Sequence, residues 1–350
     1  MSGKHAILAA LGAALLFGLS TPAAKVLLTG SDPWMTAGLL YLGSGVGLGA
    51  FRVIQRLTGS RSNEAPFRRA DMPWLMGAIV SGGGVGPVLL MLGLVSVSAS
   101  QASLLLNLEG VLTALLAWFV FREHFDRRIA FGMAFIGVGA LLLAWEPGEG
   151  FQMQCGGLLV IGACLAWAVD NNLTRKVSGG DPLMIAALKG GAAGAANLAI
   201  ALVAGGAVPA FGSAISVAVV GLLGYGVSLV LFVRALRELG AARTGAYFST
   251  APFIGAIVAI AVLREPIRLG VVAGGALMIA GLWLHLTEHH EHEHEHERLA
   301  HDHLHHHNEH HQHPHASGVA AGEPHSHPHV HAPLRHSHSH YPDIHHRHSH

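Results

Sequence analysis

The chain has 350 residues, of which 51% are hydrophobic and 12% are charged, and its formal net charge is zero. This zero hides two unlike parts, because residues 1–287 contain 18 Lys and Arg against 12 Asp and Glu, whereas residues 288–350 contain 3 against 9. A first part this apolar excludes an ordinary water-soluble domain, and no nucleic-acid partner is expected.

Apolar segments of about 20 residues recur through residues 1–287, and each has the length that an α-helix needs to cross a bilayer. The short connections leave no room for a soluble catalytic domain, so we expect no enzymatic activity. We predict an all-α polytopic membrane protein in the lipid bilayer with ten transmembrane helices. The predicted spans are residues 6–28, 33–55, 72–95, 101–121, 129–145, 155–174, 183–204, 213–235, 244–263 and 268–287.

Basic residues predict the orientation of these helices. With the N-terminus in the cytoplasm, 14 of the 18 Lys and Arg of the first part fall in cytoplasmic loops or flanks. Lys25, Arg264 and Arg268 fall on the outer side, and Lys189 lies within a span. This is a strong positive-inside bias. Because an even number of spans returns the chain to its starting side, we predict a multi-pass inner-membrane protein with both termini in the cytoplasm.

The two halves of the apolar part resemble each other. "SDPWMTAGL" from residue 31 matches "GDPLMIAAL" from 180, and "SASQASLLLNLEGVLTALLAWFVFREHF" from 98 matches "GAARTGAYFSTAPFIGAIVAIAVLREPI" from 240. Ser20 aligns with Asp170. Since five spans is an odd number, the second half must enter the membrane in the opposite orientation. We therefore predict inverted five-helix repeats at residues 1–145 and 146–287, which are typical of secondary transporters.

The matching segments begin with small residues and close with "FREHF" or "LREPI", and this pattern resembles the EamA family of the drug/metabolite transporter superfamily. The resemblance covers nearly all of residues 5–286. It implies secondary-active export through a central cavity, often of amino acids, metabolites or drugs, and no shared catalytic site. The family's proline upstream of the closing glutamate is present as Pro252, whereas the first half has Gly110. The helix geometry near Glu109 therefore does not follow from the resemblance.

Polar residues inside the spans are candidates for the substrate cavity, because a charged side chain at the bilayer centre costs roughly 2.5–3.5 kcal/mol and usually faces a cavity or a partner. The two carboxylates are predicted to bind a cation or carry a coupling proton. In the alternative interpretation, Asp170 forms an interfacial ion pair with Arg175, and Lys189 neutralises a carboxylate or extends to the interface. The candidate cavity residues are Glu109, Asp170, Asn107, Asn171, Lys189 and Tyr247.

Glycine-rich segments predict how the helices bend and pack. "SGGGVGPVLL" from residue 81 lies within a span and lacks the Gly-Lys-Ser/Thr ending of a phosphate loop, so a kinked helix is the better interpretation. Proline removes a backbone donor there, and the glycines allow close helix approach. "GSGVGLG" from 43 and "GGAAG" from 190 are predicted to pack helices rather than to mark a dimer. The candidate gating residues are Gly84, Pro87 and Pro252.

Histidine makes up 25 of the 62 residues from 289 to 350, often in His-x-His alternation. With so few apolar residues, residues 288–350 are predicted to form a disordered cytoplasmic tail. Imidazole suits zinc, copper, nickel and cobalt, and interleaved glutamates add oxygen ligands. A pH-responsive polyelectrolyte and an unselected low-complexity extension are the alternatives. The predicted metal ligands are His292, His294, His296, His301, His303, His305, His306 and His307.

These observations favour a secondary-active exporter of divalent transition-metal cations, nickel or cobalt with zinc as a third option, in which the tail captures the ions. No ATP-binding motif is present, so protons are the expected coupling ion. We expect that the chain requires no cofactor and that its tail binds Ni, Co or Zn ions. One alternative is an exporter of amino acids, metabolites or drugs whose tail only senses or buffers metal. The other is a membrane-anchored metal store or sensor, which would need only one span.

Overall fold

The computed structural model describes residues 3–58, 69–121, 127–143, 145–146, 150–151, 155–177, 181–286, 291–295, 299–305, 325–331 and 335–339. The first half contains α1 (Gly3–Leu27), α2 (Pro33–Leu57), η1 (Arg69–Asp71), α3 (Met72–Ala78), η2 (Ile79–Val85), α4 (Gly86–Ser96), α5 (Ala99–Leu105), α6 (Leu108–Phe121) and α7 (Arg127–Leu143). The second half contains α8 (Cys155–Val177), α9 (Pro182–Val203), α10 (Phe211–Gly221), η3 (Leu222–Val227), α11 (Ser228–Phe248), α12 (Ala251–Leu263) and α13 (Leu269–Leu286).

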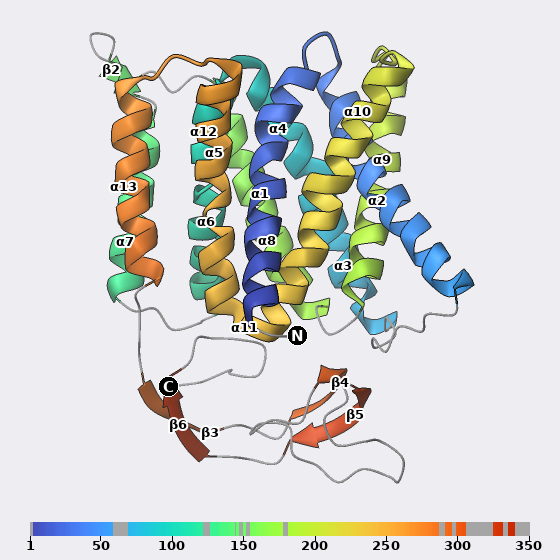
Figure 1. Cartoon of the computed structure of the whole chain (residues 1–350), viewed down its shortest axis with the longest axis vertical. Coiled ribbons are helices and arrows are strands. Elements are labelled where there is room, and N and C mark those ends of the chain that lie inside the picture. The colour runs from blue at the N-terminus through green and yellow to red at the C-terminus, as the bar shows by residue number, and fades with distance from the viewer. Residues whose placement is uncertain are drawn as a thin grey trace.

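These helices form a polytopic membrane protein. Seven segments are long and apolar enough to cross a bilayer: Lys4–Leu27, Pro33–Leu57, Arg69–Ser96, Ala99–Val120, Cys155–Thr174, Pro182–Val203 and Phe211–Ala235. Three shorter apolar helices cover Ala130–Leu143, Ala251–Leu263 and Leu269–Leu284. An apolar helix therefore lies at each of the ten predicted positions. The start of α1 and the end of α13 lie at the same end of the helical bundle (Figure 1).

An Asp-Pro pair begins one helix in each half. Asp32 accepts a hydrogen bond from the Met35 amide at 2.9 Å, and Asp181 accepts one from the Leu183 amide at 3.0 Å. Each aspartate thereby satisfies a free amide of the first turn. The proline that follows it has no N–H group, so it adds no amide that needs a partner. These caps set the starts of α2 and α9, which lie against each other. Arg52 of α2 also pairs with Asp181 at 2.6 Å.

Glycines bring the backbones of α2 and α9 into contact. A Cβ on Gly45 would lie 2.1 Å from the Gly191 amide nitrogen, and one on Gly190 would lie 2.6 Å from the Gly45 nitrogen. Such an approach is open only to residues without a side chain. The prediction that both glycine-rich segments pack helices within the chain is confirmed.

Gly45→Ala should destabilise the protein by about 1–3 kcal/mol, because the new methyl group meets backbone rather than a movable side chain. The matched control is Gly49→Ala on the same helix, where nothing lies within 4 Å of the added Cβ. Thermal unfolding in detergent should show a lower midpoint for Gly45→Ala alone. Equal midpoints for the two variants would contradict the close packing.

Two of the predicted spans are broken at positions that differ by one residue in the alignment of the halves. The predicted span 101–121 is divided into α5 and α6 by Leu106 and Asn107, and the predicted span 244–263 is interrupted at Ser249 and Thr250, between α11 and α12. Pro252 stands in the first turn of α12, while α6 has no proline in its first turn. The break in the first half therefore forms without the proline that marks its counterpart.

Each half also contains a π-helical segment. η2 covers Ile79–Val85 and continues into α4, and η3 covers Leu222–Val227 and continues into α11. When the halves are aligned with residue 98 opposite residue 240, all but the first residue of η2 align with the residues of η3. The glycine-rich stretch from residue 81 is thus an irregular helix, as predicted, and the equivalent irregularity of the second half was not predicted. π-Helical turns are rare and often occur at functional sites.

The chain reverses direction within α11. The rings of Phe232 and Phe248 have centroids 4.9 Å apart although the residues are 16 positions apart. In a straight helix this separation would place them about 24 Å apart. The reversal falls at the connection predicted between the eighth and ninth spans.

Short strands lie outside the helices. β1 (Trp145–Glu146) pairs with β2 (Gly150–Phe151) in the connection between the halves. In the tail, β3 (Glu291–Glu295) pairs with β6 (Arg335–Ser339), and β4 (Leu299–His305) pairs with β5 (His325–His331), all antiparallel. The sequence predicted a disordered tail, and these four segments differ from that prediction. The His-x-His alternation has the period of two that a strand has.

Candidate functional site

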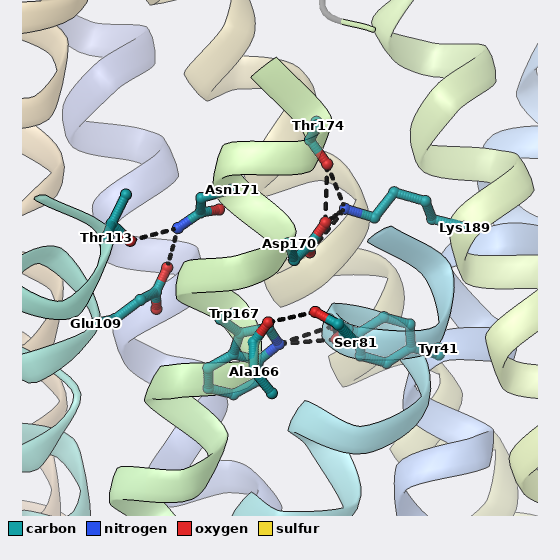
Figure 2. Close-up of polar contacts among 11 residues, drawn as sticks. Tyr41, Ser81, Glu109, Thr113, Ala166, Trp167, Asp170, Asn171, Thr174 and Lys189 are labelled. Carbon is teal, nitrogen blue, oxygen red and sulfur yellow. Dashed lines mark hydrogen bonds and ion pairs between the residues drawn. The ribbon is translucent and has the colours of Figure 1, made fainter. Parts of the chain in front are cut away.

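Glu109 lies directly after the break between α5 and α6, near the middle of the apolar segment Ala99–Val120. Asn171 of α8 donates a hydrogen bond from its Nδ2 to Glu109 Oε1 at 2.8 Å, and its second bond goes to Thr113 Oγ1 at 3.3 Å (Figure 2). Thr113 stands four residues after Glu109 and so shares its face of α6. Among the described residues, no basic side chain pairs with Glu109.

Asp170 forms a second cluster with Lys189 of α9. The Lys189 Nζ lies 2.6 Å and 2.8 Å from the two carboxylate oxygens of Asp170, and 3.2 Å from Thr174 Oγ1. Thr174 also donates to Asp170 at 2.8 Å. The side chains of the pair are only 8% and 12% exposed, so each charge depends on the other for its stabilisation. Of the alternatives considered for Asp170, the geometry is that of neutralisation by Lys189.

Helix α8 separates the two clusters. Asp170 and Asn171 are consecutive, so their side chains leave the helix about 100° apart. Figure 2 shows Glu109 and Thr113 on one side of α8 and Lys189 on the other. The structure therefore brings Glu109 together with Asn171, and Asp170 together with Lys189, without joining all four into one hydrogen-bonded site.

Two other predicted cavity residues lie apart from these clusters. Asn107 donates to the Leu104 carbonyl at 2.9 Å and contacts the Met278 sulfur at 3.8 Å. Its side chain therefore stabilises the backbone at the helix break. Tyr247 is partly buried near the end of α11, and its carbonyl accepts a bond from Thr250 at 2.6 Å.

The π-helical segment η2 exposes carbonyl groups that side chains of other helices bind. Tyr41 Oη and Trp167 Nε1 each donate to the Gly82 carbonyl at 2.8 Å, and Asn197 donates to the Gly83 carbonyl at 3.1 Å. Ser81 in turn donates to the Ala166 carbonyl at 2.5 Å (Figure 2). These bonds hold an irregular backbone inside an apolar environment, where an unpaired carbonyl would be costly.

The predicted gating residues stand at these irregular points. Gly84 lies in η2, and its carbonyl accepts a bond from Asn197 at 3.3 Å. Pro87 and Pro252 occupy the first turns of α4 and α12, directly after a π-segment and a break. A Cβ on Gly82 would lie 1.9 Å from an oxygen of Asp170, so η2 also contacts the ion pair.

The described residues contain no group of three or more His, Cys, Asp or Glu side chains arranged to hold a metal ion. Of the predicted metal ligands, His292 and His294 belong to β3, and three more belong to β4. The latter are His301, His303 and His305. His296, His306 and His307 lie outside the described residues.

Several residues of the two clusters were missed from the sequence. Thr113 and Thr174 each follow a carboxylate by four residues, and this spacing could have identified them. The contacts of Tyr41 and Trp167 with η2 join segments more than 40 residues apart, and no local signal indicates them.

Comparison with known proteins places this architecture in a class. The profile of the EamA-like transporter family matches residues 4–145 and again residues 154–287. An uncharacterized transporter of Methanothermobacter thermautotrophicus is 27% identical over 285 residues, which cover 78% of this chain and 83% of that protein. The uncharacterized transporter YyaM of Bacillus subtilis is 24% identical over 203 residues, or 55% of this chain and 66% of that protein.

A solved crystal structure has the same fold, with a TM-score of 0.60 at 17% identity over 80% of this chain and 94% of that one. The helices and these matches define a multi-pass membrane transporter. The chain belongs to the EamA-like transporter family, as its paired segments predicted.

Proposed function

We propose that the protein is a secondary-active inner-membrane exporter of divalent transition-metal cations, nickel or cobalt and also zinc. The observation that carries this proposal is the carboxylate of Glu109 at a helix break in mid-span, bound by Asn171 but by no cation among the described residues. Secondary transporters bind ions and substrates at such discontinuous helices. Glu109 would bind the partly hydrated ion or exchange it for a proton.

Alternating access by two inverted repeats is part of the proposal. Contacts of aligned residues support it, because Gly82 packs on Asp170 in the same way that its counterpart Gly224 packs on Ser20. The first helices of the two halves also begin at opposite ends of the bundle, α1 at the N-terminal end and α8 at the end where β2 lies (Figure 1). The breaks and π-segments of both halves would then be the points at which the helices bend.

The histidine-rich tail would raise the local metal concentration at the cytoplasmic opening. Its strands follow α13 at the end of the bundle where α1 begins (Figure 1). With both termini in the cytoplasm, as the basic residues favour, the tail would capture ions before export. Many overlapping histidine sites suit capacity more than selectivity.

Export of a zwitterion such as an amino acid is a second candidate. The Asp170–Lys189 pair supports it, since its carboxylate and ammonium, which are 2.6 Å apart here, would separate to bind the ammonium and carboxylate of such a substrate. In this case the tail would only buffer metal. The carrier fold is common to both candidates, and transport assays with each substrate class distinguish them.

Truncation after Thr287 tests the role of the tail. Cells that make the full chain should contain less nickel or cobalt than cells without it, and the truncated protein should retain export with a weaker effect at low metal concentration. Cell metal content and metal tolerance are the measurements, with membrane abundance of each protein as the control. If neither the full chain nor the truncated protein changes the cell content of any metal, metal export is wrong and amino-acid efflux is the next assay.

A further inference from the structure

A separate polar network lies at the distal end of the bundle, which is the end opposite the start of α1. It surrounds the connection between α4 and α5. Val97 ends α4 and Ser98 caps α5, and both have extended backbones, so the two helices are joined by these residues alone. Because this connection is so short, the position of α4 determines the position of the start of α5.

Two charged side chains hold this connection. Lys25, in the last turn of α1, donates from Nζ to the carbonyls of Leu94 and Val97, the latter at 3.0 Å. Glu265 accepts hydrogen bonds from the amides of Ala99 at 2.7 Å and Ser100 at 2.9 Å. A cation therefore meets free carbonyls at the end of α4, and an anion meets free amides at the start of α5, as helix polarity favours.

The backbone at Arg264 directs Glu265 onto α5. Arg264 ends α12 with φ 55° and ψ 37°, which is the left-handed region. A residue other than glycine seldom adopts this conformation, and tertiary contacts are needed to maintain it. Because Glu265 belongs to the second half and α5 to the first, its two bonds join the halves of the transporter at their distal end.

We propose that Glu265 keeps the carrier closed at its distal end, here called the distal gate. Its bonds to the amides of Ala99 and Ser100 at the start of α5 must break whenever the carrier opens at this end. Ser100 lies next to the contacts of Glu265 and is only 1% exposed, so its side chain is inaccessible while these bonds are intact. α5 leads directly to the helix break beside Glu109. A movement of α5 after these bonds break would therefore also shift the candidate substrate site. The inference rests on the proposed alternating access but not on the substrate.

The test measures access to position 100 in the full-length protein in membrane vesicles. Ser100→Cys introduces a nearly isosteric thiol and leaves the amide that binds Glu265. A membrane-impermeant maleimide is added from each side in turn, and labelling is followed peptide by peptide by mass spectrometry. Two native thiols serve as references, Cys155, which is exposed, and Cys164, which is buried.

Adding Glu265→Ala should raise the labelling rate at position 100 by about tenfold or more, because two charge-assisted hydrogen bonds are lost. Glu265→Gln, which keeps the length but not the charge, should give a smaller increase. The rise should come from the side on which Cys155 is labelled. Since no substrate is needed, this result is independent of whether metal is exported.

Arg264→Gly is the matched control. It removes a neighbouring charge, suits the left-handed backbone and retains the carboxylate, so labelling should stay at the rate of Ser100→Cys alone. An unchanged rate with Glu265→Ala would overturn the proposal, and so would an equal rise with Arg264→Gly. Parallel labelling of Cys164 would indicate general loss of packing instead of an opened gate, and would overturn it as well.

Discussion

Glu109→Gln is expected to reduce transport at least about tenfold, equivalent to about 1.4 kcal/mol, while the protein remains folded and inserted. The amide retains the size of the side chain and an oxygen that can accept the bond from Asn171, so only the negative charge is lost. A cation that leaves water needs this charge, and a coupling proton needs a group that titrates. Efflux of nickel, cobalt and zinc from loaded proteoliposomes measures the effect.

The matched variant for this prediction is Asn107→Ser at the same helix break. Asn107 bonds the Leu104 carbonyl and contacts Met278, so its replacement should alter transport much less than Glu109→Gln does. Glu109→Asp should retain part of the activity because the charge remains. Full transport by Glu109→Gln would show that this carboxylate neither binds the substrate nor carries the coupling proton.

Lys189→Met is expected to destabilise the protein by about 3–5 kcal/mol, because it leaves the buried carboxylate of Asp170 without its cation. Thermal unfolding in detergent should show this as a clear fall in the midpoint. The double variant Asp170→Asn/Lys189→Met should recover much of the loss, since no unpaired charge remains. The exposed Lys4 provides the control, and Lys4→Met should leave the midpoint unchanged.

The double variant also separates the two candidate functions. If the ion pair serves only to hold α8 against α9, the restored protein should still transport metal. If a zwitterionic substrate docks between the two charges, the protein should be stable but inactive toward that substrate. A double variant no more stable than Lys189→Met would show that the two side chains do not stabilise each other.

The positions of the apolar helices could be predicted from the sequence because the bilayer imposes a length and composition on each segment by itself. The Asp-Pro caps of α2 and α9 and the packing glycine Gly45 are likewise local signals, since one or two residues specify the geometry. The repeat and the family also follow from the order of residues along the chain.

The breaks and the π-segments were less predictable. Leu106 and Asn107 interrupt an apolar run without a proline, and η3 lies within the apolar segment Phe211–Ala235, which has the hydropathy of an ordinary transmembrane helix. Hydropathy reports how much of a segment is apolar. It contains little information on whether each backbone amide bonds to the carbonyl four residues earlier, to the carbonyl five residues earlier or to neither. Side chains from other helices, such as Tyr41 and Asn197, stabilise the irregular carbonyls of η2.

The partners of the charged residues were decided by the tertiary structure alone. The sequence identified Glu109, Asp170 and Lys189 as unusual residues for a membrane span, because burial of a charge is costly wherever it occurs. It could not pair Asp170 with Lys189 in preference to Arg175, nor place Glu265 on α5 of the other half, because these contacts depend on which helices are neighbours. A charge within a span is a property of its own segment, whereas the group that stabilises it is brought near by the packing of the whole bundle.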